Sequence, residues 1–134
     1  MEEQWKPWDV DSRFNKKYSI ESMIDDTENF RIKLFETMSE RNDIELVFPD
    51  SVIAYCSTDE SFRQQTIENL HQCYGGEFYA NTTFFWIENS KYLKKIQEES
   101  YGVYSQEGLM HFCIMAGDSF VDIITTYEPE IHIL

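Results

Sequence analysis

The sequence has few of the features that mark secreted, membrane-spanning or metal-binding proteins. It contains three cysteines, which lie far apart and form no CxxC pair: Cys56, Cys73 and Cys113. An odd number of separated cysteines is typical of thiols that stay reduced inside the cell. No hydrophobic run approaches the ~20 residues that span a bilayer, and the charged, aromatic N-terminus is unlike a signal peptide. We therefore expect a cytoplasmic protein that does not associate with membranes.

Positive charge is scarce as well. The 134 residues include 11 Lys and Arg against 25 Asp and Glu, which gives a formal net charge of −14. Residues 42–62 and 96–134 contain no Lys or Arg at all. Such a field repels phosphate backbones and attracts cationic surfaces, so we expect no direct binding to nucleic acid. An acidic surface that serves only solubility is the competing interpretation.

Motifs for bound cofactors are also missing. The three histidines are isolated, without the spacing of zinc ligands: His71, His111 and His132. The acidic stretch at residues 25–28 lacks the central glycine and the alternating oxygen ligands of a calcium loop. No lysine follows Gly75-Gly76, as one would in a phosphate-binding loop. We therefore expect neither a metal nor a cofactor.

What the sequence does have is the composition of a globular protein, with 42% hydrophobic and 16% aromatic residues. We expect one domain over residues 1–134, with a core of its own. Residues 1–17 hold Trp5 and Trp8 among charges, and Pro7 excludes a helix interior. We interpret this stretch as an irregular arm whose aromatic rings dock on the body. The alternative is that the two rings face a partner.

The clearest structural signal is the stretch 109–125, LMHFCIMAGDSFVDIIT. Two hydrophobic runs flank Gly117-Asp118, a pair that suits a two-residue hairpin turn. With those two residues in the turn, Ala116 pairs with Ser119, and the side chains sort onto two faces. One face is hydrophobic and must cover a core: Met110, Phe112, Ile114, Ala116, Val121 and Ile123. The other is mixed, and we expect it to be at least partly accessible: His111, Cys113, Met115, Phe120, Asp122 and Ile124.

Weaker patterns predict further strands. Alternating hydrophobic residues indicate strands at 30–35, 43–48 and 51–56, joined as an antiparallel meander by turns at 39–43 and 49–51. Another strand is predicted at 82–87, where aromatic and β-branched residues are dense. The segment 19–26 fits either a helix or a strand, and the tail at 131–134 is short and hydrophobic.

Two helices are predicted between these strands. Ser57 and Glu60 have the spacing of a capping box, and the helix that follows ends at Gly75-Gly76. Asn89 or Ser90 caps a second helix, with Gly102 as its C′ residue and a loop at 103–108 after it. The order predicts a single α+β domain: a mainly antiparallel sheet, two or three helices packed on it, and a C-terminal hairpin at 109–125.

One group on the mixed hairpin face has catalytic side-chain types. In the predicted register Cys113 lies opposite Asp122, with His111 diagonal to it and within side-chain reach. A histidine and an aspartate beside a cysteine can activate a thiolate. The middle of a strand, however, offers neither a helix N-terminus nor an oxyanion hole. The competing interpretation is a structural pair in which His111 hydrogen-bonds Asp122.

Four segments carry a resemblance to a known group of proteins: FRIKLF, DIELVFPDSVIAYCSTDESFR, ENSKYLKKIQEESYGVY and LMHFCIMAGDSFVDIIT. Their spacing, over residues 30–129, resembles that of small bacterial proteins regarded as immunity proteins of secreted or contact-delivered toxins. The resemblance rests most on residues 90–93, 100–102 and 111–122, which maintain the fold. It carries over no catalytic residue and does not identify the toxin.

Charge and resemblance lead to the same expectation: a non-enzymatic immunity protein that binds and occludes a cationic toxin domain, most simply a nuclease. The candidate contact residues are acids, with three aromatic anchors: Asp43, Glu45, Asp59, Glu60, Glu98, Glu99, Asp118, Asp122, Trp5, Trp8 and Tyr101. Two alternatives stay open. One is a small enzyme that uses Cys113, His111 and Asp122. The other is an acidic mimic of nucleic acid, with carboxylates spaced like phosphates.

Overall fold

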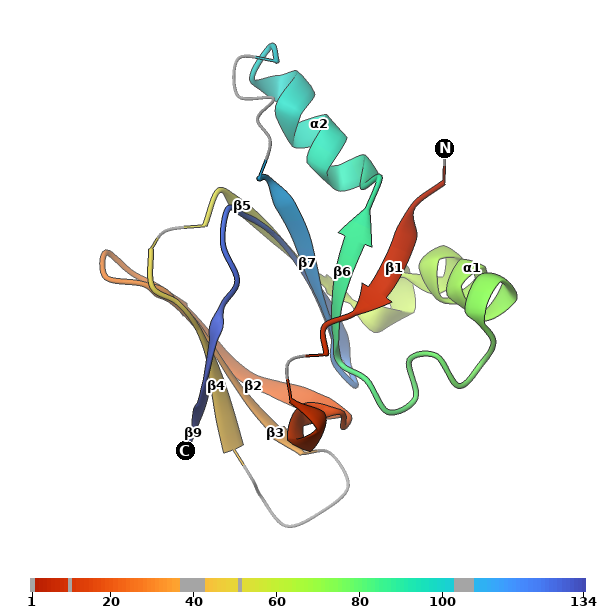
Figure 1. Ribbon diagram of the computed structural model, residues 1–134, viewed down its shortest axis with the longest axis horizontal. Coiled ribbons are helices and arrows are strands. Elements are labelled where there is room, and N and C mark those ends of the chain that lie inside the picture. Colours follow the sequence, from red (N-terminus) through yellow and green to blue (C-terminus); the bar gives the residue numbers. More distant parts are fainter. Residues whose placement is uncertain (1, 10, 37–42, 51, 103–107) are drawn as a thin grey trace.

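The computed structural model describes residues 2–9, 11–36, 43–50, 52–102 and 108–134 (Figure 1). Within these residues the chain forms two antiparallel sheets, two α-helices and two short 3-10 turns. This arrangement confirms the predicted α+β class. No helix in the described ranges is long and hydrophobic enough to cross a bilayer.

The two sheets differ in size. The larger sheet has the strand order β1-β6-β7-β8-β5, with β1 at Gln4–Pro7, β6 at Phe84–Glu88, β7 at Met110–Met115, β8 at Ser119–Thr125 and β5 at Ala54–Asp59. The smaller sheet has the order β2-β3-β4-β9, with β2 at Tyr18–Asp25, β3 at Phe30–Glu36, β4 at Asp43–Phe48 and β9 at Glu130–Ile133. The helices are α1 at Gln64–Tyr74 and α2 at Lys91–Glu99, and the 3-10 turns are η1 at Ser12–Phe14 and η2 at Glu60–Phe62.

The predicted hairpin is confirmed in its register. β7 and β8 pair antiparallel with Cys113 opposite Asp122, and the Ala116 N–H donates to the Ser119 carbonyl at 3.0 Å. Gly117 and Asp118 therefore form the turn. The hydrophobic face of the hairpin packs into the core between the two sheets, where Phe112 is fully buried.

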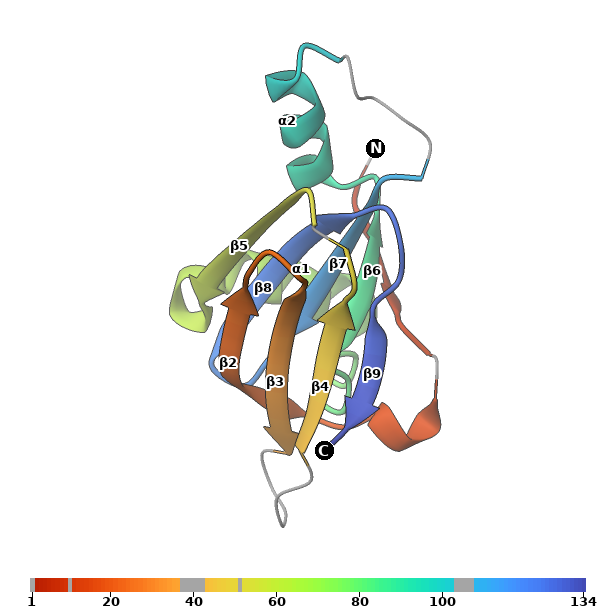
Figure 2. The ribbon, with the colours of Figure 1, turned by 90° about the vertical axis from the view of Figure 1, so that its left-hand side faces the viewer.

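The second face of the hairpin is buried as well, so the expectation that it is partly accessible is wrong. All six of its side chains fall in the buried class. α1 lies on this side of the larger sheet and packs Leu70 against it, and Trp5 belongs to the same cluster. The larger sheet is therefore the middle of three layers, with the smaller sheet on one side and α1 on the other (Figures 1 and 2).

Two terminal segments are strands that the sequence analysis did not predict. The N-terminal stretch is not wholly irregular, because β1 pairs with β6 at the edge of the larger sheet. Pro7, which has no backbone N–H, is tolerated there because one side of an edge strand has no neighbouring strand to bond to. Trp5 and Trp8 are 6% and 7% exposed, so the docking interpretation of the two rings is confirmed. The hydrophobic tail forms β9, which pairs with β4.

The predicted meander is only partly right. The ambiguous segment is a strand, and β2, β3 and β4 form a meander in the smaller sheet. β5 begins three residues later than predicted and crosses to the larger sheet, where it pairs with β8. β6 begins at Phe84 rather than at residue 82. The turn at 39–43 and the loop at 103–108 fall almost wholly outside the described residues.

The capping box predicted for the first helix is absent, because Ser57 lies within β5. Asp59 instead caps η2 by accepting the Ser61 N–H at 2.9 Å, and α1 follows from Gln64. The helix ends before Gly75, as predicted, and φ of +87° at that residue suits glycine.

α2 extends away from the rest of the molecule and has no fully buried residue (Figure 2). Ser90 caps it, as predicted, by accepting the Leu93 N–H at 2.9 Å. Its other end differs from the prediction, because Tyr101 and not Gly102 occupies C′, with φ of 56°. The Tyr101 and Gly102 N–H groups return to the Glu98 and Gln97 carbonyls, which is the Schellman closure.

We expect Phe112→Ala to lower the free energy of unfolding by about 3–5 kcal/mol, because the ring is fully buried between the sheets and its loss leaves a cavity. Phe62→Ala is the matched control, since that ring is 83% exposed. We expect it to change stability by less than about 0.5 kcal/mol. Urea titration of both variants checks the pair, and equal effects would contradict the assigned core.

Candidate functional site

A chain of four polar side chains crosses the second face of the larger sheet. The Ser90 Oγ lies 2.6 Å from the His111 Nδ1, and the His111 Nε2 lies 2.7 Å from the Asp122 Oδ1. The Arg63 Nη1 donates to the other Asp122 oxygen at 2.7 Å. Ser90 caps the start of α2, and Arg63 is the residue immediately before α1. His111 lies in β7 and Asp122 in β8. Side chains from the hairpin and from the starts of both helices therefore meet in one hydrogen-bonded row.

The direction of these hydrogen bonds follows from the acceptor at the centre. An ionised Asp122 can only accept, so the His111 Nε2 donates to it and the Nδ1 is left to accept. The Ser90 Oγ already accepts the Leu93 N–H, and its own proton is free to go to that Nδ1. Every member of the row thus has a partner, as buried polar groups require.

Asp122 stays charged although it is almost fully enclosed. Burial alone would raise the pKa of its carboxyl, but the hydrogen bond from His111 and the charge and hydrogen bond of Arg63 outweigh burial and hold the pKa below its usual value. The Arg63 guanidinium also lies over the Phe120 ring, 5.1 Å from its centroid. The arginine is therefore turned inward rather than displayed on the surface.

Cys113 is placed where the sequence predicted, opposite Asp122, but its chemistry does not suit a nucleophile. The thiol is fully buried, and burial, with the nearby Asp122 charge, raises its pKa well above the ordinary value. A thiol held in its protonated form is inert. His111 instead hydrogen-bonds Asp122, which is the contact that the competing interpretation of a structural pair predicts.

Sequence reasoning identified Ser90 only as a helix cap and did not connect it with His111. The two residues are 21 positions apart, and they meet because β6, which precedes Ser90, pairs with β7 in the larger sheet. The register places Ile87 opposite His111, so the turn after β6 brings Ser90 over the same side chain. A predicted pairing of the strand at 82–87 with the strand at 110–115 would have placed Ser90 near His111.

A cavity of about 600 Å³ lies at the base of α2, and Ser90 and His111 line part of it. Its other walls are largely hydrophobic, with a mixed-charge rim: Lys6, Pro7, Trp86, Ile87, Glu88, Asn89, Leu93, Lys94, Gln97, Leu109, Met110 and Glu128. Lys6 is paired with Glu88 at 2.9 Å. This volume is in the range of small-molecule pockets.

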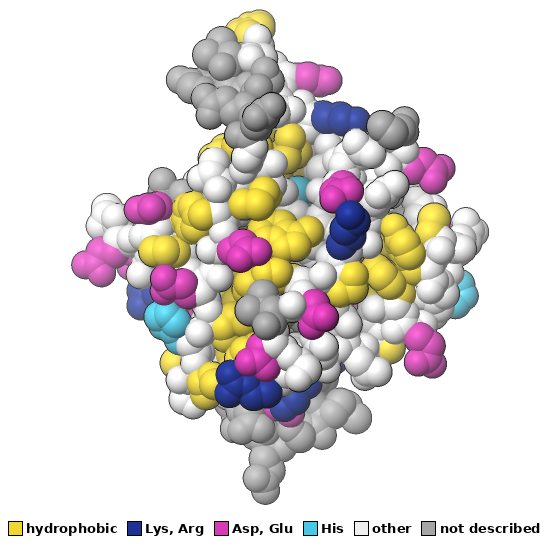
Figure 3. Space-filling model, in the orientation of Figure 1, with side chains coloured by type: hydrophobic (Ala, Val, Ile, Leu, Met, Phe, Trp, Pro, Cys, Tyr) yellow, Lys and Arg dark blue, Asp and Glu magenta, His cyan; other side chains and the backbone are white. Residues whose placement is uncertain are grey.

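The acidic candidates do not form one surface. Asp43 and Glu45 alternate with buried residues of β4 and lie on the outer face of the smaller sheet. Asp59, Glu60 and Asp118 gather where η2 meets the hairpin turn, since the Glu60 N–H donates to the Asp118 carbonyl at 3.1 Å. Glu98 and Glu99 are at the far end of α2. Figure 3 likewise shows Asp and Glu spread around a hydrophobic strip between β9 and β1.

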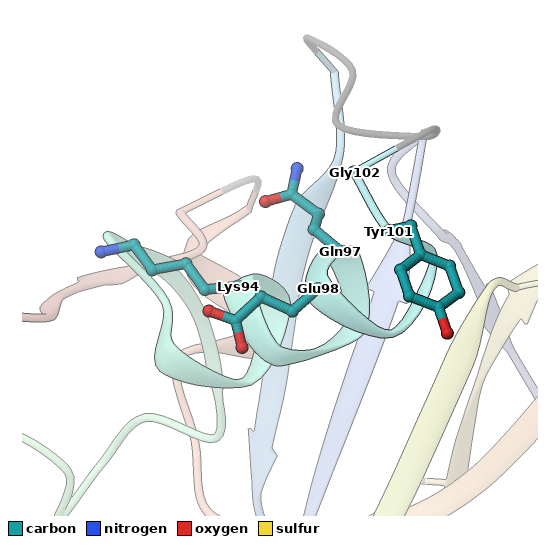
Figure 4. A pocket seen from close by; sticks show the side chains of 5 residues that line it. All are labelled: Lys94, Gln97, Glu98, Tyr101 and Gly102. Atoms are coloured by element: carbon teal, nitrogen blue, oxygen red, sulfur yellow. The ribbon is translucent and has the colours of Figure 1, made fainter.

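Three of the predicted contact residues are not on the surface at all. Asp122 is 6% exposed, and the two tryptophans are docked in the core, so none of them is free to meet a partner. Tyr101 is the exception among the aromatic candidates: it is 96% exposed. It lies just beyond α2, beside Lys94, Gln97 and Glu98, around a shallow cavity of about 390 Å³ (Figure 4).

The sequence analysis did not single out Phe62, which is largely exposed. It lies in η2 and is 83% exposed, because α1 begins only after it. It therefore stands beside the carboxylates of Asp59 and Glu60 in the same turn.

Within the described ranges, no three His, Cys, Asp or Glu side chains are arranged to hold a metal ion. Comparison with family models, with curated proteins and with solved structures finds no match for this chain.

We expect two of the three thiols to react rapidly with a disulfide reagent in the native protein, because Cys56 and Cys73 are exposed. Cys113 should react only after denaturation, since its thiol is enclosed and protonated. Thiolate release per chain, followed by peptide mapping, checks this. Rapid native reaction of Cys113 would restore the cysteine-enzyme alternative.

We expect Asp122→Asn to lower the free energy of unfolding by about 3 kcal/mol at pH 7, because it leaves Arg63 without its buried counter-charge. The pKa of the Asp122 carboxyl is lower in the folded than in the unfolded protein, so its contribution is present above the unfolded value of 3.8 and is lost as the pH falls through the folded value. The stability difference between wild type and variant should therefore shrink below pH 4. Asp118→Asn, at an exposed turn, is the matched control, because it removes a carboxylate that is exposed and has no buried counter-charge among the described residues.

Proposed function

We propose that the protein is an inhibitor of the immunity type, which binds and occludes a cationic protein domain without chemically modifying it, with a nuclease toxin in the cytoplasm as the expected partner. The observation that carries the proposal is the η2 surface, which we define as Asp59, Glu60, Phe62 and Asp118. In the described part of the chain, no lysine or arginine forms an ion pair with its three carboxylates.

The Asp59 carboxylate of the η2 surface is held in place by local hydrogen bonds. It accepts both the Ser61 N–H and the Ser61 hydroxyl, and these two bonds lower the pKa of its carboxyl. The backbone bond from the Glu60 N–H to the Asp118 carbonyl fixes η2 against the hairpin turn. One ordered carboxylate and a fixed backbone beneath the other two limit the entropy lost on binding.

Two basic side chains near this surface make internal contacts. Arg63 directs its guanidinium inward to Asp122. Lys17 donates to the Tyr79 and Thr82 carbonyls, its partial burial lowers its pKa to about 8, and the charge of Glu60 acts on it without an ion pair. A partner's lysines and arginines would therefore meet carboxylates that form no ion pair with another described residue.

Phe62 supplies the hydrophobic anchor that a charged surface needs for tight binding. Aromatic side chains at the centre of an interface carry a large share of its energy when a surrounding ring excludes water. The charges around Phe62 steer a cationic partner, and the long-range field of a chain with net charge −14 adds to the association rate. The same field keeps nucleic acid away, which suits a protein that covers a nuclease site.

The test begins with co-expression of the protein and the product of the neighbouring gene, followed by measurement of association rates. We expect Glu60→Lys with Asp118→Lys to slow association roughly 10- to 100-fold at low salt, because the steering charge is reversed at the contact. Phe62→Ala should instead speed dissociation.

The matched control is Glu98→Lys with Glu99→Lys, which makes the same change in net charge at the opposite end of the larger sheet. We expect this pair to slow association less than the η2 pair at low salt, and to alter the rate by less than about threefold at physiological salt, where the Debye length is about 8 Å. Equal effects of the two double variants would exclude the η2 surface. Absence of any bound toxin, together with absence of growth protection, would refute the proposed function.

A further inference from the structure

We propose that Ser90 is an acylatable serine, activated by His111 and Asp122, that hydrolyses small esters with a hydrophobic acyl group in the cavity at the base of α2. This activity goes beyond the proposed inhibitor function and uses a different part of the molecule. The η2 surface adjoins the turn after β7, whereas Ser90 lies beside the beginning of β7.

The three side chains have the contacts that nucleophilic catalysis by serine requires. A hydroxyl, an imidazole and a carboxylate stand in a row with heavy-atom distances of 2.6 and 2.7 Å. Such a triad is recognised by its geometry and roles rather than by its order in sequence. Arg63 holds the second oxygen of the carboxylate, so the aspartate cannot rotate away from the histidine.

The two ring nitrogens have exchanged their usual places, since the Nδ1 faces the serine and the Nε2 faces the aspartate. The chemistry is the same for either nitrogen. The carboxylate keeps one nitrogen protonated, and the lone pair of the other is then directed at the hydroxyl. Here the lone pair belongs to the Nδ1, and it is directed at the Ser90 Oγ.

The backbone around Ser90 is also suited to the reaction. β6 ends at Glu88, Asn89 has a left-handed φ of 55°, and α2 begins directly after Ser90. A sharp turn from strand to helix places a serine beside the N–H groups of the first helical turn. The Lys91 N–H donates to a Glu3 carboxylate oxygen at 2.8 Å, so this donor becomes available to an oxyanion only when the Glu3 side chain is displaced.

The cavity defines the class of substrate. Pro7, Trp86, Leu93, Leu109 and Met110 give it largely hydrophobic walls, and about 600 Å³ accommodates a medium-length acyl chain or an aromatic acyl group. Ser90 and His111 both line this cavity, which places the acyl site next to the hydroxyl and its base.

The reaction balances with water as the only other reactant. The Ser90 Oγ attacks the ester carbonyl carbon while its proton passes to the His111 Nδ1. The carbonyl re-forms as the alcohol leaves with that proton, and the acyl group stays on Ser90. Water then attacks the acyl carbon, gives a proton to the Nδ1, and the carboxylic acid departs as the proton returns to the Ser90 Oγ.

The experiment treats the full-length protein with an alkyl fluorophosphonate at pH 7.5 and maps the adduct by mass spectrometry. We expect one adduct per chain, on Ser90, and a labelling rate at least roughly 100-fold lower in His111→Asn, because the general base is missing. p-Nitrophenyl hexanoate should be hydrolysed by wild type faster than by Ser90→Ala.

The matched control is Ser61→Ala, which removes an exposed serine beside Asp59 and should label and turn over like wild type. Near-ultraviolet circular dichroism checks that each variant is folded, and the wild-type adduct map needs no variant at all. The proposal is overturned if folded wild type carries no adduct on Ser90, if His111→Asn labels as fast, or if ester hydrolysis does not depend on Ser90. Toxin binding that survives Ser90→Ala separates this outcome from the inhibitor function.

Discussion

The burial of both faces of the larger sheet is the constraint on which the rest of the molecule depends. A sheet covered on one side by a second sheet and on the other by a helix leaves its polar side chains without water. Asp122 can be ionised there only because His111 and Arg63 satisfy both of its oxygens. The Arg63 contact ties the start of α1 to the hairpin and the Ser90–His111 contact ties α2 to it, so the layers are joined by a polar row as well as by hydrophobic packing.

The hairpin was predictable because its signals are local and agree with one another. Gly117-Asp118 sets the turn, and the period-two pattern on either side permits one register. The class of fold followed from the same reasoning. What the pattern could not give was the partner of each strand: β1, β5 and β9 pair with segments far away in sequence, and their own composition is ordinary for an edge strand.

The candidate site was predictable only in part, for a related reason. The contact between His111 and Asp122 lies within the hairpin, so counting residues found it. Ser90 joins the row because β6 pairs with β7, and Arg63 joins it because its long side chain turns inward. Neither contact can be predicted from the local sequence. Charge counting correctly found an acidic chain but placed Asp122 on the surface, because a carboxylate buried with its partners looks the same in sequence as an exposed one.

The edge position of β5 has a consequence for behaviour in solution. This six-residue strand has one side paired with β8, and most of its side chains are exposed. An open edge of that length is a template for pairing with another chain. Mutual repulsion between strongly anionic molecules keeps such edges apart at neutral pH. Near the isoelectric point of about 4.4 that repulsion vanishes, and the exposed edge is then open to pairing between molecules.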